Sequence, residues 1–255
     1  MEELALHFDK NSQIYSNARY GYPKEIYEII SNYKMFGANS TILEIGAGNG
    51  IASQEIYNKW APKLTLIEPG YSLCELSRQK FNENKNIIIK NTTFEEYQSG
   101  MLFDAIFSAT AFHWIDAAIK YKKSYEILKD DGLLVLYWNN YGVENSDLER
   151  EIQEIYVKYG KGTGDGKSVY EKQMEKIDGR KKEIEKSRHF KIIEHKIMKN
   201  VTRCAGENYM TLLKTFSDHS RMEKEFFEEI REIIMRDGSE IDVRIITNLE
   251  IAGKA

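Results

Sequence analysis

Cysteine is scarce in this chain of 255 residues. The two cysteines, Cys74 and Cys204, lie far apart, and neither belongs to a Cys-x-x-Cys motif or to a cluster of cysteine and histidine. A disulfide framework needs paired cysteines, and a structural zinc site needs closely spaced sulfur and nitrogen ligands. We therefore expect buried or neutral thiols, with neither a disulfide framework nor a metal site.

The sequence also lacks an excess of positive charge and a long apolar run. Its formal net charge of −4 gives no overall attraction to a phosphate backbone, so a nucleic-acid partner is disfavoured. No apolar run approaches the length of a membrane span, and the first residues have neither the basic region nor the apolar core of a signal peptide. We therefore expect a cytoplasmic protein without a membrane partner.

Strand-like and helix-like segments alternate from residue 41 onwards, in a chain that is 42% hydrophobic and 30% charged. Apolar runs predict strands at 41–46, 63–68, 86–90, 103–109 and 132–138. Helices are predicted at 50–59, 71–82, 93–98 and 116–128. Repeated units of strand and helix fold into a doubly wound parallel sheet, and ligands lie beyond the carboxyl ends of its strands.

The pattern changes after Trp138. An amphipathic helix at 147–159, a glycine-rich stretch and a charged helical segment to about 187 predict an inserted helical lid. A strand at 189–199, helices at 206–216 and 221–236, and a last strand at 241–252 follow. The predicted organisation is an N-terminal cap over 1–40, a cofactor-binding core over 41–139, the lid over 140–188 and the rest of the core over 189–255. The sheet would have seven strands, with the final strand antiparallel.

A glycine-rich turn, Gly46-Ala47-Gly48-Asn49-Gly50, separates the first predicted strand from its helix. Glycine permits positive φ angles and leaves the backbone bare, so a ligand can lie against the turn. A phosphate loop would require a lysine after the last glycine, which is absent. The dinucleotide fingerprint G-x-G-x-x-G is one residue longer than the spacing found here. The turn alone is also compatible with tight packing.

Glu68 ends the second predicted strand, 22 positions after Gly46. A carboxylate at this point can accept hydrogen bonds from both hydroxyls of a ribose. A glutamate at a strand end is often only a polar terminus, but its distance from the glycine turn favours ribose binding.

Four segments resemble the motifs of the class I S-adenosylmethionine-dependent methyltransferases. Residues 43–50, Leu-Glu-Ile-Gly-Ala-Gly-Asn-Gly, are similar to motif I, and residues 66–69, Leu-Ile-Glu-Pro, to the second motif. Residues 103–114 resemble the fourth strand and its loop, and residues 128–135 the fifth strand and its preceding turn. The four motifs occur in the family's order across 41–138.

The N-terminal segment with Tyr15, Arg19 and Tyr20, and the loop 111–114, Ala-Phe-His-Trp, resemble the methyltransferase type 11 group, which includes the trans-aconitate methyltransferase type. This resemblance implies an α/β, Rossmann-like, doubly wound seven-stranded mostly parallel sheet with an inserted helical lid. It also implies S-adenosyl-L-methionine as cofactor and a small-molecule acceptor, a carboxylate or hydroxyl. Methylation of a protein or RNA group and non-catalytic cofactor binding stay open, as does the oligomeric state.

The same resemblance assigns cofactor contacts by position. The amino-acid part of the cofactor would lie beside the glycine turn, the ribose beside the second strand end, the adenine beside the loop after the third strand, and the sulfonium beside the fourth strand end. The assigned residues are Arg19, Glu44, Gly46, Ala47, Gly48, Glu68, Pro69, Thr93, Phe94, Ser108 and Ala109. Phe94 is equally compatible with a place in the core, and Arg19 with a solvated surface position.

His113 is the candidate catalytic residue, because a histidine on the loop after the fourth strand can orient a substrate or remove a proton. A purely structural role for the neighbouring Trp114 is the alternative. The acceptor walls are predicted to include Tyr15, Tyr20, His113, Trp114 and Trp138. Asp116 is predicted to cap the helix that follows this loop.

Overall fold

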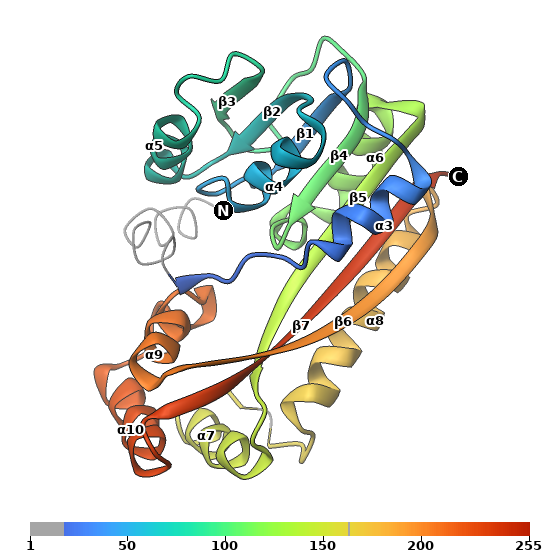
Figure 1. Cartoon of the computed structure of the whole chain (residues 1–255). Coiled ribbons are helices and arrows are strands. Elements are labelled where there is room, and N and C mark those ends of the chain that lie inside the picture. Colours follow the sequence, from blue (N-terminus) through green and yellow to red (C-terminus); the bar gives the residue numbers. More distant parts are fainter. Residues whose placement is uncertain (1–17, 163) are drawn as a thin grey trace.

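The computed structural model describes residues 18–162 and 164–255, and Figure 1 shows how their elements are arranged. The strands are β1 (Thr41–Ile45), β2 (Lys63–Glu68), β3 (Ile87–Asn91), β4 (Phe103–Ala109), β5 (Leu128–Val143), β6 (Phe190–Ala205) and β7 (Glu240–Lys254). The helices are α3 (Glu25–Tyr33), α4 (Ile51–Trp60), α5 (Tyr71–Lys80), α6 (Ala117–Ile127), α7 (Ser146–Lys158), α8 (Val169–Lys186), α9 (Gly206–Lys214) and α10 (Lys224–Arg236), with short 3-10 turns η1 (Phe112–Trp114) and η2 (Ser217–His219).

All seven strands form one sheet in the order β3-β2-β1-β4-β5-β7-β6. Strands β1 to β5 pair in parallel, whereas β7 is antiparallel to both β5 and β6. The strand order reverses between β1 and β4, which is where open α/β sheets bind their ligands. The predicted α/β, doubly wound, seven-stranded and mostly parallel sheet is confirmed, including the antiparallel last strand.

The helix predicted at 93–98 is wrong, because this segment forms a single turn. The Thr93 hydroxyl accepts the Glu96 backbone N–H at 3.2 Å, and the Tyr97 N–H donates to the Thr93 carbonyl at 3.1 Å. A threonine side chain that bonds to nearby backbone competes with continued helix formation, and so short a segment is too small to offset the cost of helix nucleation.

Strands β5, β6 and β7 extend well beyond the other strands and carry a second group of helices (Figure 1). Helices α7, α9 and α10 pack on these extensions, and α7 also contacts α10. We call α7, α9, α10 and the strand extensions the helical lobe. Its core consists of Val143, Leu148, Ile152, Ile155, Tyr209, Met210, Leu212, Leu213, Phe226, Ile230, Ile234, Ile241, Val243 and Ile245. Helix α8 instead lies along β5 and β6.

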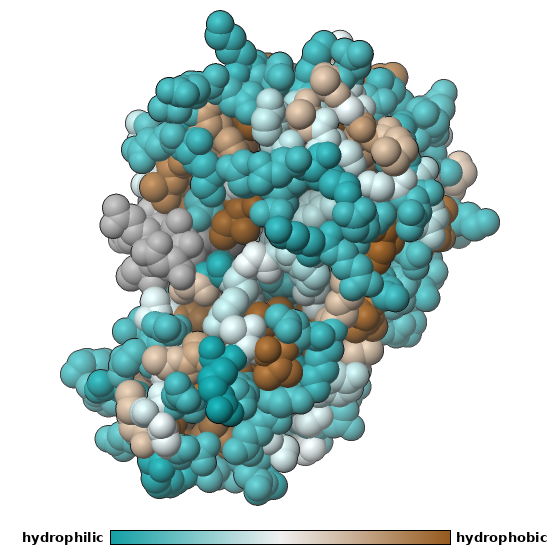
Figure 2. Space-filling model, viewed as in Figure 1, coloured by the Kyte–Doolittle hydropathy of each residue, from teal (hydrophilic) through white to brown (hydrophobic). Residues whose placement is uncertain are grey.

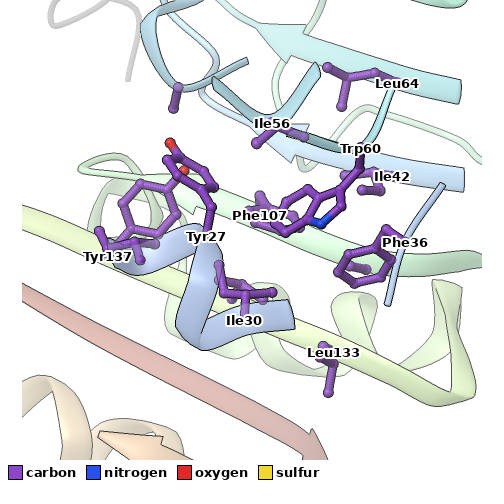
Figure 3. Close-up of a cluster of buried hydrophobic side chains, with 14 of the residues drawn as sticks. Tyr27, Ile30, Phe36, Ile42, Ile56, Trp60, Leu64, Phe107, Leu133 and Tyr137 are labelled. Atoms are coloured by element: carbon purple, nitrogen blue, oxygen red, sulfur yellow. The ribbon is translucent and has the colours of Figure 1, made fainter. Parts of the chain in front are cut away.

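Large aromatic side chains fill the core between α3, α4 and the sheet (Figure 3). The Trp60 indole lies between Phe36 and Phe107, at ring-centroid distances of 5.1 and 6.0 Å, and Tyr27 packs edge-on against it at 5.9 Å. Burying a side chain of this size stabilises the fold by roughly 1.5–3 kcal/mol. This core fixes the carboxyl ends of β1 and β4. The glycine turn begins at the end of β1, and the loop that leads to η1 begins at the end of β4.

Hydrophilic side chains cover most of the face seen in Figure 2, and the hydrophobic patches there are small and scattered. Within the described residues, no helix combines the length and the apolar character that crossing a membrane requires.

Candidate active site

The glycine turn after β1 has the left-handed backbone that its sequence requires. Gly46 and Gly48 have φ angles of +68° and +58°. A Cβ atom on Gly46 would lie 2.3 Å from the Ala111 Cβ, so the turn and the loop after β4 approach each other too closely for any side chain. The N–H groups of Gly46 and Ala47 donate to the Ile67 carbonyl at 2.9 and 3.1 Å. The turn is thereby fixed against the ends of both neighbouring strands.

Glu68 lies at the end of β2, directly opposite this turn. Its Oε2 accepts the Gly48 N–H at 2.9 Å, and its Oε1 accepts the Gly70 N–H at 2.8 Å. The residue is 7% exposed. Because each carboxylate oxygen can accept more than one hydrogen bond, these contacts orient the group without preventing it from accepting ribose hydroxyls.

The first of three adjoining cavities lies beside Glu68, and we call it the adenosine cavity. Among its lining residues are Gly46, Gly48, Glu68, Pro69, Thr93, Phe94, Ala109, Thr110 and Trp114. Ile45, Ile67, Leu73 and Ile115 complete an apolar wall. A carboxylate at the edge of a mostly apolar slot matches a ribose joined to a flat purine. Phe94 is 3% exposed, so it belongs to the core and to this wall at once.

The second cavity lies behind the glycine turn, and we call it the methionine cavity. It is lined by Arg19, Tyr20, Tyr22, Glu44, Gly46, Ala47, Gly48, Asn49, Ile51, Ala52, Ala109, Thr110 and Tyr141. Glu44 is 1% exposed, and the Ser53 hydroxyl donates to its Oε2 at 2.5 Å. Its Oε1 has no hydrogen-bond partner within the described residues, and burial raises the pKa of this carboxyl to about 8. A buried carboxyl oxygen without a partner fits the ammonium group of an amino acid.

Arg19 lies where the methionine cavity meets the largest cavity, and it lines both. Its Nη2 donates to the Thr215 carbonyl at 3.0 Å, and the guanidinium lies 4.8 Å from the Phe216 ring centroid and 5.5 Å from that of Tyr141. The helical lobe therefore places this arginine close to the glycine turn.

The largest cavity, of about 410 Å³, lies between the loop after β4, helix α8 and the helical lobe. We call it the acceptor cavity. Thr110 lines all three cavities, and Trp114 lines both this one and the adenosine cavity, so the three spaces adjoin. Four cationic side chains line it: Arg19, Lys172, Lys176 and Arg180. The last three recur at four-residue intervals along α8, within a helix so rich in charge that the sequence gives little sign of this stripe.

His113 lines the acceptor cavity from η1, and Trp138 lies beneath it. The Trp138 Nε1–H donates to the His113 Nδ1 at 3.1 Å. Burial, reinforced by the positive charges of Arg180 and Lys176, lowers the pKa of His113 to about 3. Trp138 is only 2% exposed and does not line the cavity, so the prediction that it forms an acceptor wall is wrong. The long β5 buries it in the sheet, where it supports His113.

Other predicted site residues lie in varied surroundings. Ser108 is fully buried, and its hydroxyl donates to the Ile45 carbonyl at 2.9 Å, so its side chain faces β1 and not a cavity. Ala109 lines the adenosine and methionine cavities. Tyr20 lines the methionine cavity and not the acceptor cavity, so the prediction that it forms an acceptor wall is wrong. Tyr15 lies outside the described residues. The predicted N-cap is confirmed, because the Asp116 carboxylate accepts the Ala118 N–H at 2.9 Å.

Thr110 is a site residue that the sequence pattern did not identify. It adopts a left-handed φ of +56°, which a β-branched residue rarely does. Its hydroxyl lies 2.9 Å from the Tyr22 hydroxyl and 3.3 Å from the Asn139 N–H. Such strain concentrates at functional sites. The available signal was its position one residue after Ala109, at the end of β4.

Comparisons with known proteins find similarity to methyltransferases. Residues 42–132 match the family model of a methyltransferase domain. An uncharacterized methyltransferase of Schizosaccharomyces pombe is 24% identical over 242 residues, which cover 91% of each chain.

Two solved structures share the fold. A protein of Anaeromyxobacter dehalogenans assigned to the type II methyltransferases has a TM-score of 0.61 at 14% identity, covering 92% of this chain and 97% of that one. A phosphoethanolamine N-methyltransferase of Haemonchus contortus, solved with S-adenosylhomocysteine, has a TM-score of 0.52 at 13% identity, covering 98% of this chain and 56% of that one.

Proposed function

Since the chain belongs to the class I S-adenosylmethionine-dependent methyltransferases, we propose that it methylates a small molecule bound in the acceptor cavity. The observation that supports this most strongly is the meeting of three cavities at Thr110. A volume of about 410 Å³ is in the range typical of small-molecule sites. A donor in the two smaller cavities would have its reactive centre at the opening into the third.

The cofactor S-adenosylmethionine supplies an activated methyl group on a sulfonium centre. We assign its ribose to Glu68, its adenine to the wall formed by Thr93 and Phe94, and its ammonium group to Glu44. Arg19 would bind its carboxylate, because a guanidinium matches a carboxylate in charge and geometry. Ala109 would border the sulfonium, where the lack of a long side chain leaves room for the methyl group.

The protein's contribution to the reaction is alignment and exclusion of water. Methyl transfer is an in-line displacement, so holding the acceptor atom opposite the sulfur lowers the barrier without a covalent intermediate on the protein. Trp114, 37% exposed and lining both the adenosine and the acceptor cavities, would shield the point where donor and acceptor meet. The acceptor atom is proposed to be an oxygen, of a carboxylate or a hydroxyl.

Calorimetric binding of S-adenosylhomocysteine tests the donor site. Replacing Glu68 with alanine should weaken binding at least tenfold, because charge-assisted hydrogen bonds to the ribose are lost. Glu75→Ala is the matched control, since Glu75 is half-exposed on α5 and pairs with Arg78 outside the cavities; it should change the affinity less than twofold. The proposal fails if the wild-type protein does not bind S-adenosylhomocysteine but binds NADH tightly.

The acceptor is tested by incubating the protein with isotopically labelled S-adenosylmethionine and a panel of small carboxylic acids, phenols and amines. Mass spectrometry should find the label in a product of the panel. Transfer only to an added protein or RNA would replace the small-molecule assignment.

A further inference from the structure

Trp138 contacts two side chains that line the acceptor cavity, although it does not line the cavity itself. Its indole N–H donates to His113 Nδ1 at 3.1 Å, and the Arg180 guanidinium lies over its ring, 4.4 Å from the centroid. Because Trp138 is held in the middle of the sheet, it fixes both groups relative to each other.

The hydrogen bond from Trp138 determines which nitrogen of His113 carries the proton. An indole N–H can only donate, so the Nδ1 that it meets must accept through its lone pair. A neutral imidazole then carries its proton on Nε2. His113 therefore offers an N–H at the nitrogen that faces away from Trp138, and it has no lone pair there with which to remove a proton.

The charges around His113 are predominantly positive. Arg180 and Lys176 act on it from α8, Lys120 from α6, and Arg19 from the N-terminal segment, although Lys120 is itself paired with Glu183 at 2.5 Å. Burial, reinforced by these charges, opposes an imidazolium and keeps the ring neutral. The space that the ring borders is also lined by Asp218 and by Glu149, which is paired with Arg244. The four cationic side chains on its wall outnumber these acidic groups and favour an anion there.

Arg180 is anchored through one of its three nitrogens. Its Nη1 donates to the side-chain oxygens of Asn140 and Asn248, at 3.3 and 3.1 Å. Within residues 18–162 and 164–255, Nε and Nη2 make no hydrogen bond and the guanidinium makes no ion pair, although Glu250 and Glu183 lie near enough to attract it. The edge of the guanidinium formed by Nε and Nη2 has the geometry that binds a carboxylate or phosphate with two parallel hydrogen bonds.

Lys176 lies one helical turn before Arg180, so both side chains project from the same side of α8. It is exposed at the cavity, and no acidic group of the described chain forms an ion pair with it. Its neighbour Lys172, by contrast, pairs with Asp165 at 3.1 Å. Lys176 thus forms no ion pair within the described residues, although Asp218, which lines the same cavity, also acts on it.

We propose that His113 Nε2–H, Arg180 and Lys176 form a cradle for an oxyanion of the acceptor, a carboxylate or a phosphate. The inference rests on the proposed function and narrows its acceptor to an anionic small molecule. In this arrangement His113 is a hydrogen-bond donor to the acceptor and does not act as a base. An ionised acceptor oxygen forms the bond to the methyl carbon while the carbon–sulfur bond breaks and leaves its electron pair on sulfur, so no proton has to move.

The tautomer can be measured without a substrate. Long-range proton–nitrogen NMR of the histidine-labelled protein should show His113 neutral, with its proton on Nε2, from pH 5 to 8. The His113→Gln variant identifies the signals. In Trp138→Phe, which keeps the aromatic ring and loses the donor, the tautomer should become mixed. A proton on Nδ1, or an imidazolium at pH 6, would overturn the role assigned to His113.

The cradle itself is tested by calorimetry with succinate and with inorganic phosphate, on protein saturated with S-adenosylhomocysteine. Binding of one probe identifies the oxyanion as carboxylate or phosphate. Arg180→Gln should weaken that binding at least tenfold and leave the affinity for S-adenosylhomocysteine within twofold. The control Arg150→Gln removes an exposed arginine of α7 that pairs with Asp147, and should leave both affinities unchanged.

The outcomes separate the two proposals. If S-adenosylhomocysteine binds but neither anion does, or if Arg180→Gln and Arg150→Gln behave alike, the cradle is refuted and the methyltransferase assignment stands. If S-adenosylhomocysteine fails to bind, the proposed function itself is refuted.

Discussion

Glu44 is a carboxyl group that the fold holds away from water. Burial raises its pKa from an ordinary 4.5 to about 8, and only one of its oxygens has a hydrogen-bond partner within the described residues. Its unfolded form ionises above pH 4.5 while its folded form keeps the proton, so the free energy of unfolding falls as the pH rises from 4.5 to 8. The residue thus lowers the stability of the cofactor-free protein at neutral and alkaline pH.

Glu44→Gln should therefore stabilise the cofactor-free protein, by ~2–4 kcal/mol at pH 8 and by little at pH 5. The amide can still accept the Ser53 hydroxyl, so the change removes mainly the cost of ionisation. Urea unfolding of both proteins between pH 5 and 8.5 measures this difference. A stability difference that does not depend on pH would contradict the raised pKa. The same variant should bind S-adenosylhomocysteine more weakly, because the Glu44 carboxyl can ionise beside the ligand's ammonium group and the amide cannot.

Two of the three glycines of the turn, Gly46 and Gly48, differ in what surrounds them, and this allows a matched comparison. Both have positive φ angles, but a Cβ on Gly46 would meet Ala111 at 2.3 Å, whereas nothing lies within 4 Å of a Cβ on Gly48. Gly48→Ala should lower the free energy of unfolding by about 1–2 kcal/mol through backbone strain alone.

Gly46→Ala should cost clearly more than Gly48→Ala, roughly 2–4 kcal/mol, because the turn and the loop after β4 must move apart. Chemical denaturation of the two variants measures the difference. Equal losses of stability would show that the loop after β4 yields freely and that the close approach has no energetic consequence.

At the residue level, the sequence predicted those positions whose chemistry is local. Gly46, Gly48 and Glu68 were identifiable because spacing and residue type together define the turn and the carboxylate opposite it. Trp138 was misplaced and Thr110 was missed, because whether a side chain lines a cavity depends on pairing between β5 and β7 and on packing of the loop after β4. Neither this strand pairing nor this loop packing leaves a local pattern in the sequence.

Helix α6 illustrates an element whose start the sequence specifies directly. Asp116 accepts the Ala118 N–H and so satisfies one of the free donors in the first turn. Asp116→Ala should lower the free energy of unfolding by about 1 kcal/mol. Glu126→Ala, at an exposed position of the same helix facing Lys122 at 3.9 Å, should change it by less than about 0.5 kcal/mol. Thermal unfolding of the two variants provides the test, and similar losses would refute the capping role.

The full length of β5 cannot be predicted from the residues of the strand itself. Residues 139–143 begin with two asparagines and include a glycine, all poor strand formers. They are nevertheless paired with β7, where the Thr247 hydroxyl donates to Asn139 Oδ1 at 2.7 Å and the Asn140 amide donates to the Ile246 carbonyl at 3.1 Å. Partners more than 100 residues away thus override local preference, so the extension could not be predicted.

At the scale of the whole molecule, the doubly wound, mostly parallel sheet was predictable because strand and helix alternate from residue 41 to Trp138. The helical lobe was not, because it joins α7 to α9 and α10, which are separated in sequence by α8 and β6. The segment predicted as a lid supplies only part of it. As a result, the walls of the acceptor cavity come from segments that no single stretch of sequence indicates.

A buried ion pair links the long strands to the helical lobe. Arg244 of β7 donates to Glu149 of α7 at 2.7 Å, and both side chains are less than 10% exposed. Arg244 also donates to the Val143 carbonyl at 2.8 Å, while Glu149 accepts the Val143 N–H at 3.0 Å. The pair therefore closes the end of β5 against both α7 and β7.

Removing one partner of this pair should destabilise the lobe without reaching the donor site. Arg244→Met leaves the Glu149 carboxylate buried and uncompensated, which should cost about 3–5 kcal/mol, and adding Glu149→Leu should recover most of that loss. Urea unfolding of the single and double variants measures both effects. Neither residue lines the adenosine or methionine cavity, so the folded variants should keep their affinity for S-adenosylhomocysteine within threefold. A parallel loss of that affinity would mean that the lobe and the donor site are coupled, and that acceptor binding can control cofactor binding through β5 and β7.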